Sequence, residues 1–302
     1  MANLDFNLTN LEQRASNPDG TEGEGLSHKT GGIGGAGMVL VQVLELAPPV
    51  DLLVDGEPRA AAIVVHDIGG HGRQYEDLAV ALSRAGLIVS LPDLRGHGSS
   101  EGPRGHVPGL PEPVRDIHNV REHVAYRMPG ARSVVVGVGA GALFAMEYAK
   151  QHADEVHGVV LVAPLVKPDF EIPAKGKGLL GRFKKPAPTD GMPLGWSADM
   201  LRSDAGAQQA WSSDSKRNDE LTVRAAEVIQ AAAQSAVAGY KALGKPTLVL
   251  AGADDPLAKP ADLEALAQEL GAEYECFPGM RHDLFGDAGS EAVIARTVAF
   301  CD

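Results

Sequence analysis

A chain of 302 residues is long enough for one α/β domain with an inserted segment, and 44% hydrophobic with 22% charged residues is ordinary for a globular protein. The net charge of −13 argues against nucleic acid or an anionic membrane surface as the main partner, because both are bound by clustered Lys and Arg. Cys276 and Cys301 supply neither a disulfide framework nor zinc-site spacing. A basic, apolar leader is not recognisable and apolar runs are short, so we expect a cytoplasmic protein.

The first 37 residues are predicted to be a flexible segment. Asn, Gly and Glu dominate it, and residues 31–35 read GGIGG. A phosphate-binding glycine loop needs a strand before it and a helix after it. Here a predicted strand, residues 38–46, follows the glycines, so we do not expect phosphate binding.

From residue 38 onward, predicted strands alternate with predicted helices. Continuous apolar runs or β-rich segments predict strands at 38–46, 61–65, 87–91, 134–136, 159–162, 247–250 and 274–277. Helical spacing of apolar residues predicts helices at 76–85, 114–124, 142–150, 261–270 and 291–300. This alternation predicts βαβ units and a mostly parallel, doubly wound sheet.

One stretch, residues 166–245, interrupts this alternation. It has no convincing strand, contains a helical pattern at 221–240, and includes large apolar side chains that need a place to pack. We interpret it as an inserted helical cap, with the α/β core formed by 38–165 and 246–302. A basic cluster in the cap allows two interpretations, a weak membrane contact or a solvated loop. Its residues are Lys175, Lys177, Arg182, Lys184 and Lys185.

The most specific chemical signal is the turn at residues 137–141, GVGAG, between a predicted strand and a predicted helix. Small flanking residues are what a nucleophile elbow needs, because the turn is sharp and its central residue has strained backbone angles. The central residue of a G-x-S-x-G elbow is serine, but here it is Gly139. The alternative is a glycine-rich turn without catalytic ancestry.

Two later segments favour the elbow. Asp254 and Asp255 follow one buried strand, and His282 follows the next. The chain order of elbow, acid and histidine is that of α/β-hydrolases. A carboxylate at the end of one strand and a histidine after the next can meet at the same edge of the sheet, where the acid orients the imidazole.

Three motifs resemble those of monoacylglycerol lipases and lysophospholipases of the serine aminopeptidase S33 type. Residues 66–75, HDIGGHGRQY, resemble the segment H-G-x-G-E-H-S-x-R-Y of that family. Residues 92–102, PDLRGHGSSEG, are similar to its D-x-R-G-H-G-x-S-x-G loop, and residues 279–285, GMRHDLF, are close to the bacterial form of its ending. The resemblance extends from about residue 38 to the C-terminus and implies an α/β-hydrolase fold.

Carried over position by position, the resemblance implies a triad acid at Asp255 and a triad base at His282, with Gly139 at the nucleophile position. The acid stands three residues after the strand-end glycine, which favours Asp255 over Asp254. The backbone N–H groups of Ile68 and Ala140 would form the oxyanion hole. The same resemblance assigns His66, His71 and Tyr75 to substrate binding.

The departures from the family pattern lie in the same site. Gly139 lacks a hydroxyl, and Asp67 puts a carboxylate where the family has glycine, near the expected oxyanion hole. Gly70 and Gln74 stand where the family often has polar glycerol-binding groups. The glycine at position 139 and the carboxylate at position 67 both oppose the conventional acyl-enzyme route.

We therefore carry three hypotheses on function. The first is a weakened or non-catalytic lipase- or esterase-like protein that binds a small acyl or ester-like ligand. The second is an enzyme that uses Asp255 and His282 as a general base without a covalent step. The third is a working carboxylic-ester hydrolase in which Gly139 is an introduced, inactivating substitution.

We expect no cofactor. The polar cluster of His66, Asp67, His71, Asp93 and His97 allows a metal site, but we favour hydrogen-bonded loops and predict none.

Overall fold

The computed structural model describes residues 27–33, 39–54, 56–174 and 185–302. Its main feature is an eight-stranded sheet in the order β1-β2-β4-β3-β5-β6-β9-β10. The strands are β1 Ser27–Ile33, β2 Val41–Ala47, β3 Ala60–Val65, β4 Leu87–Pro92, β5 Arg132–Val138, β6 Gly158–Val162, β9 Thr247–Gly252 and β10 Glu273–Phe277. β2 pairs with β1 and β4 in antiparallel fashion, whereas β4, β3, β5, β6, β9 and β10 are parallel to one another. The predicted mostly parallel sheet is confirmed.

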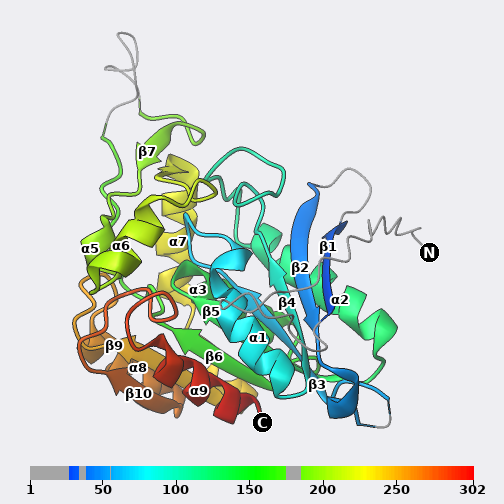
Figure 1. Ribbon diagram of the computed structural model, residues 1–302. Helices are drawn as coiled ribbons and strands as arrows, with labels where there is room; N and C mark the ends of the chain where they lie inside the picture. The colour runs from blue at the N-terminus through cyan, green and yellow to red at the C-terminus, as the bar shows by residue number, and fades with distance from the viewer. Residues whose placement is uncertain (1–26, 34–38, 55, 175–184) are drawn as a thin grey trace.

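Helices cover both faces of the sheet, as the crossovers between parallel strands require. They are α1 Glu76–Arg84, α2 Pro111–Arg127, α3 Ala140–Gln151, α8 Pro260–Leu270 and α9 Ser290–Cys301. α1 and α9 contact each other on one face, and α2 and α3 contact each other on the opposite face (Figure 1). Short 3-10 turns lie at Val50–Leu52, Gly72–Tyr75 and Lys241–Leu243. Among the described residues, no helix combines the length and the apolar character needed to cross a membrane.

Between β6 and β9 the chain leaves the sheet and forms the inserted segment, which lies at one end of the sheet in Figure 1. It contains β7 Gly191–Pro193, α5 Ala198–Leu201, α6 Ala205–Ser212, β8 Glu220–Thr222 and α7 Val223–Ser235. β7 and β8 pair in antiparallel fashion, so this segment is not purely helical as predicted. Strands of three residues are too short to show a period of two in the sequence, which is why the pattern missed them.

The N-terminal prediction is also partly wrong. Residues 27–33 form β1, the edge strand of the sheet, and pair with β2 over their full length. Strand pairing satisfies the backbone of a glycine-containing segment that its composition alone marks as flexible. The remaining N-terminal residues, and most of the basic cluster at 175–185, lie outside the described residues.

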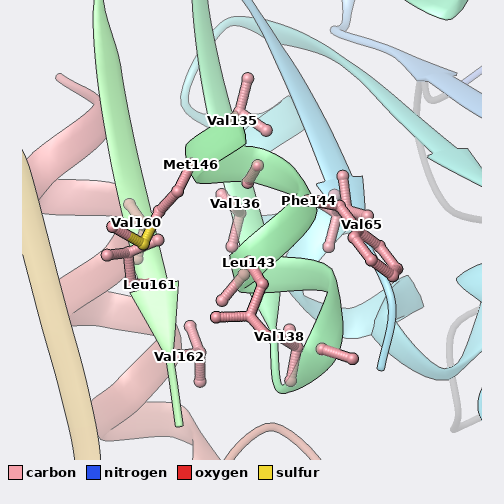
Figure 2. Packing of buried hydrophobic residues seen from close by; sticks show 14 of the residues in the cluster. Val65, Val135, Val136, Val138, Leu143, Phe144, Met146, Val160, Leu161 and Val162 are labelled. Atoms are coloured by element: carbon pink, nitrogen blue, oxygen red, sulfur yellow. The ribbon is translucent and has the colours of Figure 1, made fainter. Parts of the chain in front are cut away.

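The core directly beneath the elbow is densely apolar. Val136 and Val138 of β5 pack with Leu143 and Phe144 of α3, and these four side chains are at most 2% exposed. Figure 2 shows α3 running back beside β5, with Phe144 next to Val65 of β3 and Met146 next to Val160 of β6. A helix fixed in this way along its first two turns holds the residue before it, Gly139, in one place.

Candidate active site

Four parallel strands deliver the site residues to one edge of the sheet. The loop after β3 carries Asp67 and Ile68, and the turn after β5 carries Gly139 and Ala140. Asp255 follows β9 and His282 follows β10. Because the carboxyl ends of parallel strands lie at the same edge, residues up to 215 positions apart in the chain meet there.

Gly139 has the backbone of a nucleophile elbow. Its φ of 55° and ψ of −117° lie in a region that side chains other than glycine rarely adopt. The neighbouring Gly141 approaches the carbonyl oxygens of Val65 and His66 so closely that a Cβ there would overlap both. The turn is therefore the sharp strand-to-helix turn that the sequence predicted, with β3 pressed against it.

The space above Gly139 is occupied by the side chain of Asp67. A Cβ added at Gly139 would lie within 3.0 Å of Cγ and of both carboxylate oxygens of Asp67. Real Cβ atoms essentially never come so close to another heavy atom, so a side chain at 139 and the present position of Asp67 exclude each other.

One oxygen of this carboxylate accepts both predicted oxyanion-hole donors. Oδ1 of Asp67 accepts hydrogen bonds from the backbone N–H of Ile68 at 2.7 Å and of Ala140 at 2.6 Å. The two N–H groups named from the sequence therefore converge on one point, as donors for a developing oxyanion must. That point already holds a carboxylate oxygen.

The other oxygen of Asp67 contacts the histidine. Oδ2 lies 3.1 Å from Nε2 of His282, whose Nδ1 lies 2.8 Å from Oδ2 of Asp255. Asp255 is anchored in turn, because its Oδ1 accepts the backbone N–H groups of Leu257 and Ala258. The predicted acid and base thus come together, and the imidazole lies between two carboxylates.

The charges around His282 determine its protonation. Burial alone lowers the pKa of a histidine, but Asp255 and then Asp67, by charge and hydrogen bonding, outweigh it and raise the pKa of His282 to about 10. His282 is 1% exposed. At neutral pH it is an imidazolium that donates a proton from each nitrogen.

A narrow, mostly apolar cavity opens onto this arrangement. Asp67, Ile68 and His282 line its floor, while Leu194, Trp196, Leu201, Trp211, Arg217 and Asn218 come from the inserted segment. The space that the centre of a water-sized sphere can reach in this cavity measures about 30 Å³. The ring of Trp196 lies edge-on to His282 at 5.5 Å.

A larger cavity of about 440 Å³ lies beyond the narrow one. Leu194 and Trp196 line both cavities, so these two side chains form the wall between them. Leu165, Phe170, Met200 and Leu257 give the outer cavity apolar walls, and Asp169 and Glu171 add acidic groups.

The predicted substrate-binding role of His66, His71 and Tyr75 is not supported, since none of them lines either cavity. His66 is fully buried, donates from Nδ1 to the Asp67 carbonyl and accepts the Leu94 N–H at Nε2. His71 pairs with Asp214 at 2.7 Å, and Tyr75 packs against Phe285. These side chains hold loops together instead.

The polar cluster considered for a metal is likewise occupied by protein partners. Asp93 accepts the N–H groups of Gly72 and Ser99, and burial lowers the pKa of both His66 and His97 to about 3. A separate trio, His118, His152 and Glu155, has its possible ligand atoms within 4.8 Å of one another. There Arg121 lies 3.7 Å from Glu155 and opposes a second cation.

The sequence predicted that Asp67 lies near the oxyanion hole, but not that the Asp67 carboxylate fills the oxyanion hole. The signal was present as two complementary changes, a lost side chain at 139 and a gained carboxylate at 67. The cavity wall at Leu194, Trp196, Trp211 and Asn218 was also missed, because no motif marks it.

Comparison with known proteins agrees with this architecture. Residues 56–289 match the family model described as serine aminopeptidase, S33. A monoacylglycerol lipase from Mycolicibacterium smegmatis is 27% identical over 252 residues, which are 80% of this chain and 87% of that one.

Two solved structures share the fold. The monoacylglycerol lipase of Paleococcus ferrophilus has a TM-score of 0.70 at 22% identity, covering 86% of this chain and 99% of its own. A soluble variant of the Saccharomyces cerevisiae monoglyceride lipase, in complex with a substrate analog, has a TM-score of 0.73 at 18% identity, covering 100% and 98%. With its α/β-hydrolase fold and a family match over most of its length, the chain belongs to the serine aminopeptidase S33 family of monoacylglycerol-lipase-like hydrolases.

Proposed function

We propose that this chain binds a small, neutral acyl or ester-like ligand at the edge of the sheet and does not form an acyl-enzyme at residue 139. The observation behind the proposal is the Asp67 carboxylate, which fills the space above Gly139 and accepts both N–H groups of the oxyanion hole. A carbonyl oxygen of a ligand has no access to that pair of donors while Asp67 holds them.

The general-base alternative fits the site less well. A general base has to be unprotonated at the working pH and within reach of the proton that it removes. Nε2 of His282, the atom that would accept the proton, is paired with Asp67, and the pKa of His282 is raised to about 10 by Asp255 and Asp67 against the effect of burial. At neutral pH this histidine is already protonated.

The close fit of Asp67 also favours Gly139 as a native residue. An isolated change of serine to glycine leaves an empty space, whereas here that space is filled by a side chain with satisfied hydrogen bonds. This supports a site in which Gly139 and Asp67 are complementary, with the Asp67 side chain filling the space that Gly139 leaves.

The charged and apolar groups that line the cavities indicate which kind of ligand they can bind. A carboxylate ligand would be repelled by Asp67 at the floor of the inner cavity and by Asp169 and Glu171 at the outer one. The apolar walls favour a ligand with an apolar body and a neutral polar group. A monoacylglycerol or a simple ester fits this description better than the fatty acid of the same chain length.

Thermal unfolding with a ligand series tests the proposal, because a ligand that binds only the native state raises the melting temperature. We expect monoacylglycerols or esters to raise it more than the matching fatty acids. Leu194→Trp, which adds bulk to the wall of both cavities, should abolish the shift, and Leu52→Trp at an exposed position should not. The absence of a shift with every neutral ligand, or an equal shift in Leu194→Trp, would overturn the proposal.

A further inference from the structure

The two oxygens of the Asp67 carboxylate are held differently. Oδ1 has two backbone donors, at 2.7 and 2.6 Å, whereas the contact made by Oδ2 is to His282 at 3.1 Å. The Asp67 side chain is 11% exposed and lines the inner cavity. Oδ2 therefore retains lone-pair electrons for a molecule in the cavity, while Oδ1 is fixed.

This arrangement suits an ester of Asp67. If Oδ2 were bonded to carbon, Oδ1 would become the ester carbonyl oxygen with two N–H donors already in place. Attack of water on Cγ would put negative charge on Oδ1, where those donors stabilise it. His282, oriented by Asp255 and next to Oδ2, would be positioned to take the proton of that water.

We propose that Asp67 is a nucleophile that displaces halide from a small alkyl halide, forming an aspartyl ester that water then hydrolyses. The proposal rests on the proposed function, since the alkyl halide occupies the same cavity. Carboxylates are known to form such covalent intermediates in other enzymes. The reacting carboxylate here comes from the loop after β3 and reaches over the glycine of the elbow.

In the first step a bond forms between Oδ2 of Asp67 and the carbon, and the bond between carbon and halogen breaks. The halide leaves with the electron pair. Esterification removes the negative charge of Asp67, so the pKa of His282 falls; the halide leaves as an anion, and His282 releases its Nε2 proton to solvent. His282 is then neutral.

In the second step the oxygen of water attacks Cγ and His282 takes one proton. The bond between Cγ and Oδ2 breaks, and the alcohol leaves with Oδ2 and the proton from His282. The new carboxyl group then protonates His282 and restores the pair. Alkyl halide and water become alcohol, halide and a proton, and the oxygen of the attacking water stays in Asp67.

The cavity wall favours a halide over a strained cyclic ether as leaving group. A departing ether oxygen needs a proton donor on the side of the carbon opposite Asp67, and His282 lies on the same side as Asp67. From the inserted segment the wall instead receives the indoles of Trp196 and Trp211, whose N–H groups are hydrogen-bond donors, and Arg217, which carries a positive charge but is paired with Asp219. Such groups stabilise an anion without giving up a proton.

The test uses 1-bromohexane on the full chain. In His282→Gln, which keeps a hydrogen-bond donor beside Oδ2 but has no base, a hexyl ester should accumulate on Asp67 and be visible by intact mass and peptide mapping. Asp67→Asn, with nearly the same shape, is the matched control and should carry no adduct at that position. The unchanged chain should release bromide and hexanol.

A single turnover of the unchanged chain in ¹⁸O water gives an independent readout that needs no variant to fold. The heavy oxygen should appear in Asp67 and not in the first hexanol released. Heavy oxygen in that hexanol, or no adduct and no bromide release, would overturn the proposal. If a monoacylglycerol still raises the melting temperature in the second case, the proposed ligand binding stands and the nucleophile alone is wrong. Reaction of 1,2-epoxyhexane but not 1-bromohexane would overturn the halide leaving group.

Discussion

Gly139 and Asp67 share one volume: the carboxylate of Asp67 lies where any side chain at position 139 would begin. It bonds to the N–H of Ala140, the next residue after Gly139, and to His282. The two positions, 72 residues apart in the chain, therefore behave as one structural unit. Their coupling determines what single changes at either position can do.

A serine at 139 should be poorly tolerated on its own. Gly139→Ser has to accept a positive φ, a strain of about 1–3 kcal/mol, and also has to displace a buried carboxylate from its hydrogen bonds. Adding Asp67→Gly removes the overlap but not the strain. In denaturant unfolding, the serine should cost clearly less stability in the Asp67→Gly background than alone, with a coupling of about 0.5–3 kcal/mol. Additive costs would mean that the two side chains do not meet.

Acid should destabilise the protein through two buried histidines. Burial lowers the pKa of both His66 and His97 to about 3, against 6.5 when exposed. Between pH 6.5 and 3 the unfolded chain binds two protons that the folded chain does not, so stability falls with falling pH by up to about 1.4 kcal/mol per unit for each histidine. His97→Asn should reduce the slope of stability against pH by the contribution of about one proton. An unchanged slope would show that His97 is not buried as a neutral ring.

Alkali should weaken the site through His282. Its pKa is raised above the unfolded value, so its stabilising contribution is complete below pH 6.5 and disappears as the pH rises toward about 10. Asp67→Asn keeps the shape but removes one of the two charges, and should lower the pKa of His282. Nitrogen NMR of the imidazole would measure this, and the same titration in both proteins would contradict the contact with Asp67.

Trp196 should limit ligand length. Together with Leu194 it separates the narrow cavity at His282 from the larger outer one. Trp196→Ala should join the two and move the largest ligand-induced rise in melting temperature to longer monoacylglycerols. Unchanged length dependence in Trp196→Ala would show that Trp196 is not the barrier.

The fold and part of the site could be predicted from the sequence for a specific physical reason. Buried parallel strands are continuous apolar runs, and their carboxyl ends share an edge, so the meeting of Asp255 and His282 followed from chain order. The roles of His66, His71 and Tyr75 did not follow, because a motif records residue types and not which way a side chain points. His66 is turned into the loop between Asp67 and Leu94, away from the cavity.

The hydrogen bonds of Asp67 were not predicted from the sequence, for a different reason. A carboxylate near an oxyanion hole is expected to oppose catalysis by its charge, and that much was predicted. That it would bond to both donors and to His282 depends on an ångström-level fit above Gly139, which residue types alone do not record.

Labelling with a fluorophosphonate that reacts with activated serines tests the central claim most directly, namely that Asp67 occupies the place of a nucleophile above Gly139. The unchanged chain should remain unlabelled, Gly139→Ser should label slowly or not at all, and Gly139→Ser with Asp67→Gly should label at residue 139, because only then are the hydroxyl, His282 and the two N–H groups free to act together. The account would be contradicted if Gly139→Ser alone labelled as fast as the double variant, since Asp67 would then not be in the way.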